Sequence, residues 1–420
     1  MNRSKVTGWV LGLALVAGCG GGSSPSTPAP APAPAPSKPT LSPGPHPALL
    51  VSQAWFQTEA GRPVPRPAKL TILRTDGKHW VPEVLMDPES NVFHKAMPWR
   101  DGILTIGGTE ARLDYWTKGP DGQWSPKVLF QHSWGGQFDR LRDIEIGDVD
   151  GDGKDEIVLA THDQGAVEVG DENADGTWTF QEIDHHTDTF VHEIELGDLD
   201  GDGKLEIYAT PSDRNRANLV SQPGGVVRYV YDPKTKHYDR TQLAHWDGSH
   251  AKEILVTDLG TGHDHLYASR EGVTKKEGGA VKLVDPVRII RLDPQPDGSW
   301  KQTIVATLQD QQCRFLVPGD VDHDGTVEIV AAGMKSGVYV LEPKDDGTFD
   351  PELIDGNSSG YEHATDIADL DGDGTPEIYV AADDQGKLQR YEWDGKGYAR
   401  SEVAEIPPKT ITFNLGHGTF

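Results

Sequence analysis

A motif of alternating aspartates recurs along the chain and limits its fold more than any other feature. The pattern Asp-x-Asp-x-Asp-Gly-x-x-Glu-Ile occurs four times, at Asp148–Glu156, Asp198–Glu206, Asp320–Glu328 and Asp369–Glu377. A degenerate copy begins at Asp258, where Gly260, Thr261 and Gly262 replace the segment that carries the second and third aspartates. Successive copies start 50, 60, 62 and 49 residues apart, and each is flanked by apolar, strand-like runs. Such a period indicates one supersecondary unit repeated along the chain.

A second repeated pattern gives the number of units. A turn signal followed by an aromatic residue occurs seven times; six of the turns contain Asp-Gly and one contains Asp232-Pro233. Asp-Gly is a strong signal for a tight hairpin turn, and the aromatic ring would pack on the flanking strand. The aromatic residues are Trp80, Trp124, Trp178, Tyr238, Trp300, Phe349 and Tyr398. Seven units of about 53 residues, each with four strand-like runs, predict an all-β fold, a seven-bladed β-propeller over residues 48–420.

The two ends of the repeat region indicate how the ring closes. Residues 48–52 match the second strand of a unit, whereas residues 410–416 match a first strand. Each four-stranded sheet has two apolar faces and must pack against neighbours on both sides. We therefore expect the C-terminal strand to complete the blade that begins at residue 48.

The acidic loops have the chemistry of calcium sites. Aspartates at alternate positions, a Gly for a sharp turn, a backbone carbonyl at position seven and a carboxylate at position nine form an oxygen cage suited to Ca²⁺. Four carboxylates on one short turn repel one another unless a cation offsets them. We predict about four structural Ca²⁺ ions and none at the Asp258 loop. The candidate ligands are Asp148, Asp150, Asp152, Lys154, Glu156, Asp198, Asp200, Asp202, Lys204, Glu206, Asp320, Asp322, Asp324, Thr326, Glu328, Asp369, Asp371, Asp373, Thr375 and Glu377.

The stretch Gly147-Asp148-Val149-Asp150-Gly151-Asp152-Gly153 and its equivalents resemble the FG-GAP/VCBS repeat family, which includes the integrin α-subunit propeller. The resemblance is good over residues 130–420 and weak over 48–130, since the first two units lack the loop. It implies Ca²⁺ between the first and second strands of a blade. Because the family includes adhesion modules, carbohydrate-binding proteins and a few lyases and dehydratases, the resemblance does not select one function.

A column of basic residues stands out in a chain whose formal charge is −27. Counting back six positions from each loop aspartate gives Arg142, His192, Lys252, Arg314 and His363, in five consecutive blades. His250 lies close by. First strands line the channel of a propeller, so these side chains should converge at its mouth, at the end opposite the ion loops. They either pair with neighbouring acids and tie the blades together, or form a funnel that binds an anionic or hydroxyl-rich ligand.

These observations leave three functions open. The favoured one is a binding module for a carbohydrate or another cell-envelope polymer, with Tyr361 and other aromatic residues on the funnel side. The second is a sugar lyase or dehydratase that uses His192, His363 or His250 with Arg142 and Arg314. The third is a scaffold for an envelope protein complex. The acidic composition argues against nucleic-acid binding, which needs clustered Lys and Arg.

The N-terminal residues predict export and attachment to a membrane. Residues 1–18 combine Arg3 and Lys5 with a short apolar stretch, as in a signal peptide. They lead into Val16-Ala17-Gly18-Cys19, which resembles the lipobox of bacterial lipoproteins and implies lipidation at Cys19. Residues 19–47 are rich in Pro, Ala, Gly and Ser and predict a disordered linker. The predicted location is the bacterial cell envelope, on the outer membrane by the same resemblance.

Overall fold

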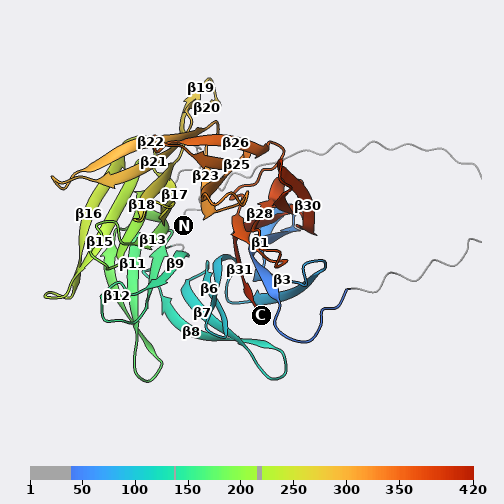
Figure 1. The fold of residues 1–420 in the computed structure, drawn as a ribbon. Coiled ribbons are helices and arrows are strands. Elements are labelled where there is room, and N and C mark those ends of the chain that lie inside the picture. The colour runs from blue at the N-terminus through green and yellow to red at the C-terminus, as the bar shows by residue number, and fades with distance from the viewer. Residues whose placement is uncertain (1–38, 137–138, 215–219) are drawn as a thin grey trace, which may run out of the picture.

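The fold is a closed ring of seven antiparallel four-stranded sheets, seen in a computed structural model that describes residues 39–136, 139–214 and 220–420 (Figure 1). Cys19 and the predicted signal peptide lie outside the described residues. Within the described ranges the single helix is a 3-10 turn, η1 (Asp383–Gln385), and no helix there is long and apolar enough to cross a bilayer.

The blades follow one another along the chain, and each has four strands ordered from the channel outward. The first blade contains β31 (Thr410–Thr419), β1 (Pro47–Glu59), β3 (Ala68–Thr75) and β4 (Trp80–Asp87), with β2 (Arg62–Pro65) paired to the end of β1. The second contains β5 (Phe93–Trp99), β6 (Gly102–Gly107), β7 (Ala111–Lys118) and β8 (Trp124–His132). The third contains β9 (Leu141–Gly147), β10 (Glu156–Thr161), β11 (Ala166–Glu172) and β12 (Trp178–His185).

The remaining four blades repeat this order. The fourth contains β13 (Thr189–Gly197), β14 (Glu206–Asp213), β15 (Gly224–Asp232) and β16 (His237–Trp246). The fifth contains β17 (Ala251–Thr257), β18 (His265–Arg270), β21 (Val287–Pro294) and β22 (Trp300–Leu308), and carries a separate hairpin of β19 (Val273–Glu277) and β20 (Ala280–Asp285). The sixth contains β23 (Cys313–Gly319), β24 (Glu328–Gly333), β25 (Gly337–Pro343) and β26 (Phe349–Asp355). The seventh contains β27 (Thr365–Ala368), β28 (Glu377–Ala382), β29 (Lys387–Trp393) and β30 (Tyr398–Glu405).

The ring is closed by the C-terminal strand. β31 pairs with β1 from Pro47–Thr419 to Trp55–Thr410 and contacts the inner strands β27 and β5 on either side. Figure 1 shows its red ribbon beside the blue strands of the first blade. The chain therefore contributes its last strand to the blade formed by its first strands.

The apolar core lies between the blades. Each hydrophobic cluster combines side chains of two neighbouring sheets; one contains Leu49 and Leu73 of the first blade with Tyr379 and Leu388 of the seventh. The repeated aromatic residues lie at the start of the outer strands, as the first or second residue, and Trp80, for example, packs edge-to-face on Tyr379 at 5.9 Å. The Asp-Gly turns before them hold their glycines at positive φ, such as 83° at Gly77, which glycine adopts without steric cost.

Candidate functional site

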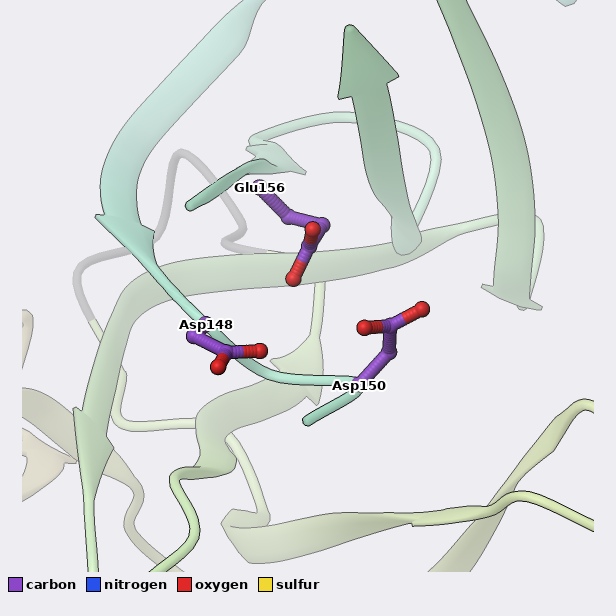
Figure 2. A group of neighbouring side chains, drawn as sticks. All are labelled: Asp148, Asp150 and Glu156. Carbon is purple, nitrogen blue, oxygen red and sulfur yellow. The ribbon is translucent and has the colours of Figure 1, made fainter. Parts of the chain in front are cut away.

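The first ion loop is organised by its own acidic side chains. The Asp148 carboxylate accepts hydrogen bonds from the backbone N–H groups of Gly151 and Gly153 at 2.7 and 3.0 Å. At the far end of the loop, Glu156 Oε2 accepts from the backbone N–H of Val149 at 2.9 Å. These bonds hold the carboxylates of Asp148 and Glu156, which converge with the Asp150 carboxylate on one point, as Figure 2 shows.

The same convergence occurs in all four intact loops. The first, third and ninth residues of each loop offer ligand oxygens within 4.8 Å of one another. The pKa of each ninth residue (Glu156, Glu206, Glu328 and Glu377) is raised to about 7, chiefly by burial. In the third loop, Glu328 Oε1 is buried and has no hydrogen-bond partner among the described residues. The donor set and this orphaned oxygen fit a hard cation that takes oxygen ligands.

The fifth and seventh residues of the loops have a local role. The fifth aspartate of each loop (Asp152, Asp202, Asp324 and Asp373) accepts a hydrogen bond from the backbone N–H of the seventh residue, Lys154, Lys204, Thr326 or Thr375. The fifth aspartate is not in the group of three converging carboxylates. Ligation through these eight residues stays a prediction.

The degenerate loop at Asp258 keeps the turn but lacks the alternating aspartates. The Asp258 carboxylate accepts from the backbone N–H and the hydroxyl of Thr261 at 2.6 and 3.0 Å. His265 pairs with Thr257, the position that Glu156 holds against Gly147 in the third blade. Within the described residues this loop is not among the groups of three or more metal-ligating side chains.

The column of basic residues sits on a repeated β-bulge. In the second to sixth blades, the register between the first and second strands slips at the same place. The extra residues at these slips include His94, Arg142, His192, Lys252 and Arg314. A bulge leaves a residue out of the ladder and re-aims its side chain, so that Arg142 contacts Glu362 across the channel, whereas the next residue, Asp143, pairs with Lys95 of the neighbouring blade.

Two arginines of the column meet one glutamate. Glu362 Oε2 lies 3.3 Å from Arg142 Nη2 and 2.9 Å from Arg314 Nη1, which joins the third, sixth and seventh blades. The side chains of Arg142, Arg314 and Glu362 are 7%, 6% and 2% exposed, respectively. The one carboxylate thus offsets one of the two guanidinium charges, and all three groups are shielded from solvent. This arrangement matches the inter-blade tie among the two alternatives for the column.

The remaining column residues are also buried. Lys252 Nζ lies 3.3 Å from His192 Nε2, and that nitrogen lies 3.1 Å from Ser212 Oγ. The His192 ring stacks on His250 at 5.1 Å, and burial, followed by the charge of Lys252, lowers the pKa of both imidazoles. Burial also lowers the pKa of Lys252 to about 7.

His363 lies apart from this group. It contacts the backbone carbonyl of Gly333 and the hydroxyl of Ser358, both at 2.7 Å. The seventh blade has no bulge between β27 and β28, which pair without a slip from Thr365 onward. His363 therefore precedes its inner strand, in a left-handed conformation with a φ of 59°.

Removing the shared carboxylate should destabilise the ring. In Glu362→Ala, two buried guanidinium groups lose their common partner, and breaking a buried pair costs about 3–5 kcal/mol. We expect the free energy of unfolding in urea to fall by about that amount. Lys335→Ala removes a solvent-exposed ion pair with Asp384 and should change the free energy of unfolding by about 1 kcal/mol or less. Equal effects of the two variants would contradict the bridging role of Glu362.

Sequence reasoning missed several residues that contact the loops. Tyr208 and Tyr379 donate to the ninth-position glutamates, Glu206 and Glu377, at 2.5 and 2.8 Å. A signal was present: two of the Glu-Ile pairs are followed by Tyr and the other two by Val. Their partners Arg228 and Arg390 lie beyond the loops, on the third strands, and no local pattern marks them.

Comparison with known proteins agrees with the repeat and the fold. The model of the FG-GAP-like repeat matches residues 148–209 and 320–380. Each stretch runs from one ion loop through the strands that follow it to the next ion loop and into the strand after that loop. No curated protein matches the sequence.

Several solved structures have a similar fold. A putative 6-phosphogluconolactonase from Bacteroides uniformis is 13% identical, with a TM-score of 0.56 over 89% of this chain and 99% of that one. One from Bacteroides fragilis is 13% identical, with a TM-score of 0.52 over 88% and 98%. The periplasmic gluconolactonase PpgL of Pseudomonas aeruginosa is 12% identical, with a TM-score of 0.53 over 88% and 99%. At these identities the likeness shows the fold alone.

Proposed function

We propose that this chain, a seven-bladed β-propeller with FG-GAP-like repeats, is a calcium-stabilised module that binds a carbohydrate at the end opposite its ion loops. The single observation that carries the proposal is an open cleft of about 570 Å³ at that end. Its size lies within the range of about 300–1,000 Å³ that is usual for small-molecule sites.

The cleft lies at the seam between the third and fourth blades. One wall is the end of β12 with the loop to β13, which contribute His185 and His186. The other wall is β16, with Arg240, Gln242 and His245. The loop that joins β14 and β15 starts and ends at the same opening, which puts the cleft at the end away from the ion loops. Ser212 lines the cleft and also contacts His192 of the column at 3.1 Å.

The charges around the cleft favour an uncharged, hydroxyl-rich ligand. Arg240 Nε already pairs with Asp184 at 3.0 Å, and His186 pairs with the other oxygen of that carboxylate at 2.9 Å. His245 lies 3.4 Å from Asp247. The cleft therefore has little net positive charge to attract an anion, but it has imidazole, amide and guanidinium groups that hydrogen-bond to sugar hydroxyls.

Calcium is the ion that the loops suit best. The ligands are all oxygen, and the loops match a repeat whose ion is calcium by the resemblance described above. Bound Ca²⁺ would neutralise the converging carboxylates and stiffen the turns between first and second strands. The ion loops lie at the end away from the cleft, so the role that we propose for bound ions is structural.

A glycan array with matched arginine variants tests the carbohydrate site. Arg240 and Arg400 occupy equivalent positions: each pairs with an aspartate of the preceding blade that also accepts from a tyrosine, Asp184 with Tyr229 and Asp355 with Tyr391. We expect Arg240→Ala and Gln242→Ala to weaken glycan binding at least about tenfold, as loss of hydrogen bonds to buried ligand groups does. Arg400→Ala should leave binding unchanged.

Two results would count against this proposal. One is an array with no bound glycan; the other is equal loss of binding in Arg240→Ala and Arg400→Ala, which would reflect a general loss of stability. Gluconolactone is a useful additional ligand because similar structures carry lactonase names. Hydrolysis of it by this chain would favour an enzyme over a binding module.

Attachment to the outer membrane through Cys19 and a role in an envelope complex remain proposals from the sequence. A lipid anchor followed by an extended linker would hold the cleft away from the membrane surface, where it could reach envelope polymers.

A further inference from the structure

The four ion loops are of two kinds. In the second loop, Arg228 Nη2 lies 2.7 Å from Asp200 Oδ2 and 3.2 Å from Glu206 Oε1. In the fourth, Arg390 Nη2 lies 2.6 Å from both Asp371 Oδ2 and Glu377 Oε1. In each loop a guanidinium thus contacts two of the three converging carboxylates. We call these two the arginine-filled cages.

The other two loops have no such cation among the described residues. The position of Arg228, opposite Tyr208 in the β14–β15 ladder, is held in the third blade by Val169, opposite Val158. In the sixth blade the same pair is Val340 and Val330, whereas in the seventh it is Arg390 and Tyr379. All four valines are buried. The loops Asp148–Glu156 and Asp320–Glu328 are therefore open cages, bordered by apolar side chains.

The Tyr–Arg pair occupies acceptor sites that an ion would need. Tyr208 and Tyr379 donate to one oxygen of the ninth-position glutamate, and the arginine holds the other. In the open cage of the third loop, by contrast, the corresponding oxygen, Glu328 Oε1, is buried without a partner among the described residues. An extra positive charge and fewer free oxygens both weaken Ca²⁺ binding, since ligand charge sets affinity in such loops.

From this difference we propose that the chain has two classes of calcium site: the open cages bind Ca²⁺ tightly, and the arginine-filled cages bind it at least about tenfold more weakly. The structural ions predicted from the sequence, about four, are thereby divided between two tight sites and two weak ones. The inference rests on the calcium part of the proposed function. The arginine supplies in the second and fourth loops much of the charge compensation that the ion supplies in the first and third.

Calcium titration of the full chain tests this proposal. After dialysis against a chelating resin, calorimetric titration with calcium chloride should show two tight sites per chain, and metal analysis at the end of that phase should find two ions. Arg228→Met, which removes the charge and keeps most of the side-chain volume, should raise the number of tight sites to three. The double variant Arg228→Met/Arg390→Met should raise it to four.

A third arginine provides the control. Arg240 lies on the next strand of the same blade and pairs with Asp184, away from the cages, so that Arg240→Met changes the net charge equally and should leave two tight sites. Calcium should raise the melting temperature of Arg228→Met by more than it raises that of Arg240→Met. Four equal sites in the unmodified chain, or two in Arg228→Met, would overturn the two classes while calcium binding stands. Absence of any calcium binding would overturn both proposals.

Discussion

A chain that lacks residues 409–420 is expected to lose its cooperative unfolding transition. This truncation removes β31, which forms the inner ladder of the first blade and lies between the inner strands of its two neighbours. The backbone groups of β1 that faced β31 lose their partners, at about 1 kcal/mol each, and the apolar contacts of Leu415 with the first and seventh blades are lost. Because a domain is stable by only about 5–15 kcal/mol, this loss should open the ring.

Differential scanning calorimetry is the appropriate measurement for the truncation. A control of similar length replaces Lys275–Leu283, most of the β19–β20 hairpin, with two glycines. The hairpin forms its own sheet outside the four strands of the fifth blade and projects from the ring in Figure 1. We expect this control to keep a single transition within a few degrees of the intact chain. An unchanged melting temperature after removal of residues 409–420 would show that β31 is not needed for closure.

Chelation of calcium should lower the melting temperature by about 10 °C. An ion at a free concentration 1,000-fold above its Kd contributes about 4 kcal/mol, so the two open cages together contribute roughly 8 kcal/mol. An unfolding entropy of about 2.1 cal/mol/K per residue converts this free energy into a shift of that size for a domain of this length. The measurement is thermal unfolding in millimolar calcium and again in excess EDTA.

A variant of the open cages is the control for chelation. Asp150→Asn combined with Asp322→Asn removes one ligand charge from each open cage and should eliminate most of the difference between calcium and EDTA. Asp121→Asn, in an exposed turn between β7 and β8 of the second blade, is not one of the converging carboxylates and should preserve the difference. Equal melting temperatures of the intact chain in calcium and in EDTA would refute a stabilising role of the ions.

The sequence predicted a structural feature wherever the residues that form it are contiguous in the chain. Each ion loop spans nine neighbouring residues, so that the spacing of Asp148, Asp150 and Glu156 already implied converging carboxylates. Each outer hairpin depends on one short turn, Asp-Gly in six of the seven, and one aromatic residue. Counting such local units gave the number of blades, because every unit must form one sheet.

The sequence pattern predicted the position of the basic column but not its burial. Alignment of the loop aspartates placed Arg142, His192, Lys252 and Arg314 in one structural column, and the repeated bulge explains why they share it. Their burial could not be read in the same way. The two arginines meet at Glu362, which lies 220 residues from Arg142 along the chain and contacts it only across the closed channel.

The sequence by itself thus determined the repeat, the number of blades and the acidic loops, because these features depend on residues within a few positions of one another. The tertiary structure alone decided three others: the burial of the basic column, the cleft between the third and fourth blades, and the division of the cages into open and arginine-filled. Each of these depends on side chains from different strands or blades. Their proximity is set by strand register and ring closure, which no local spacing encodes.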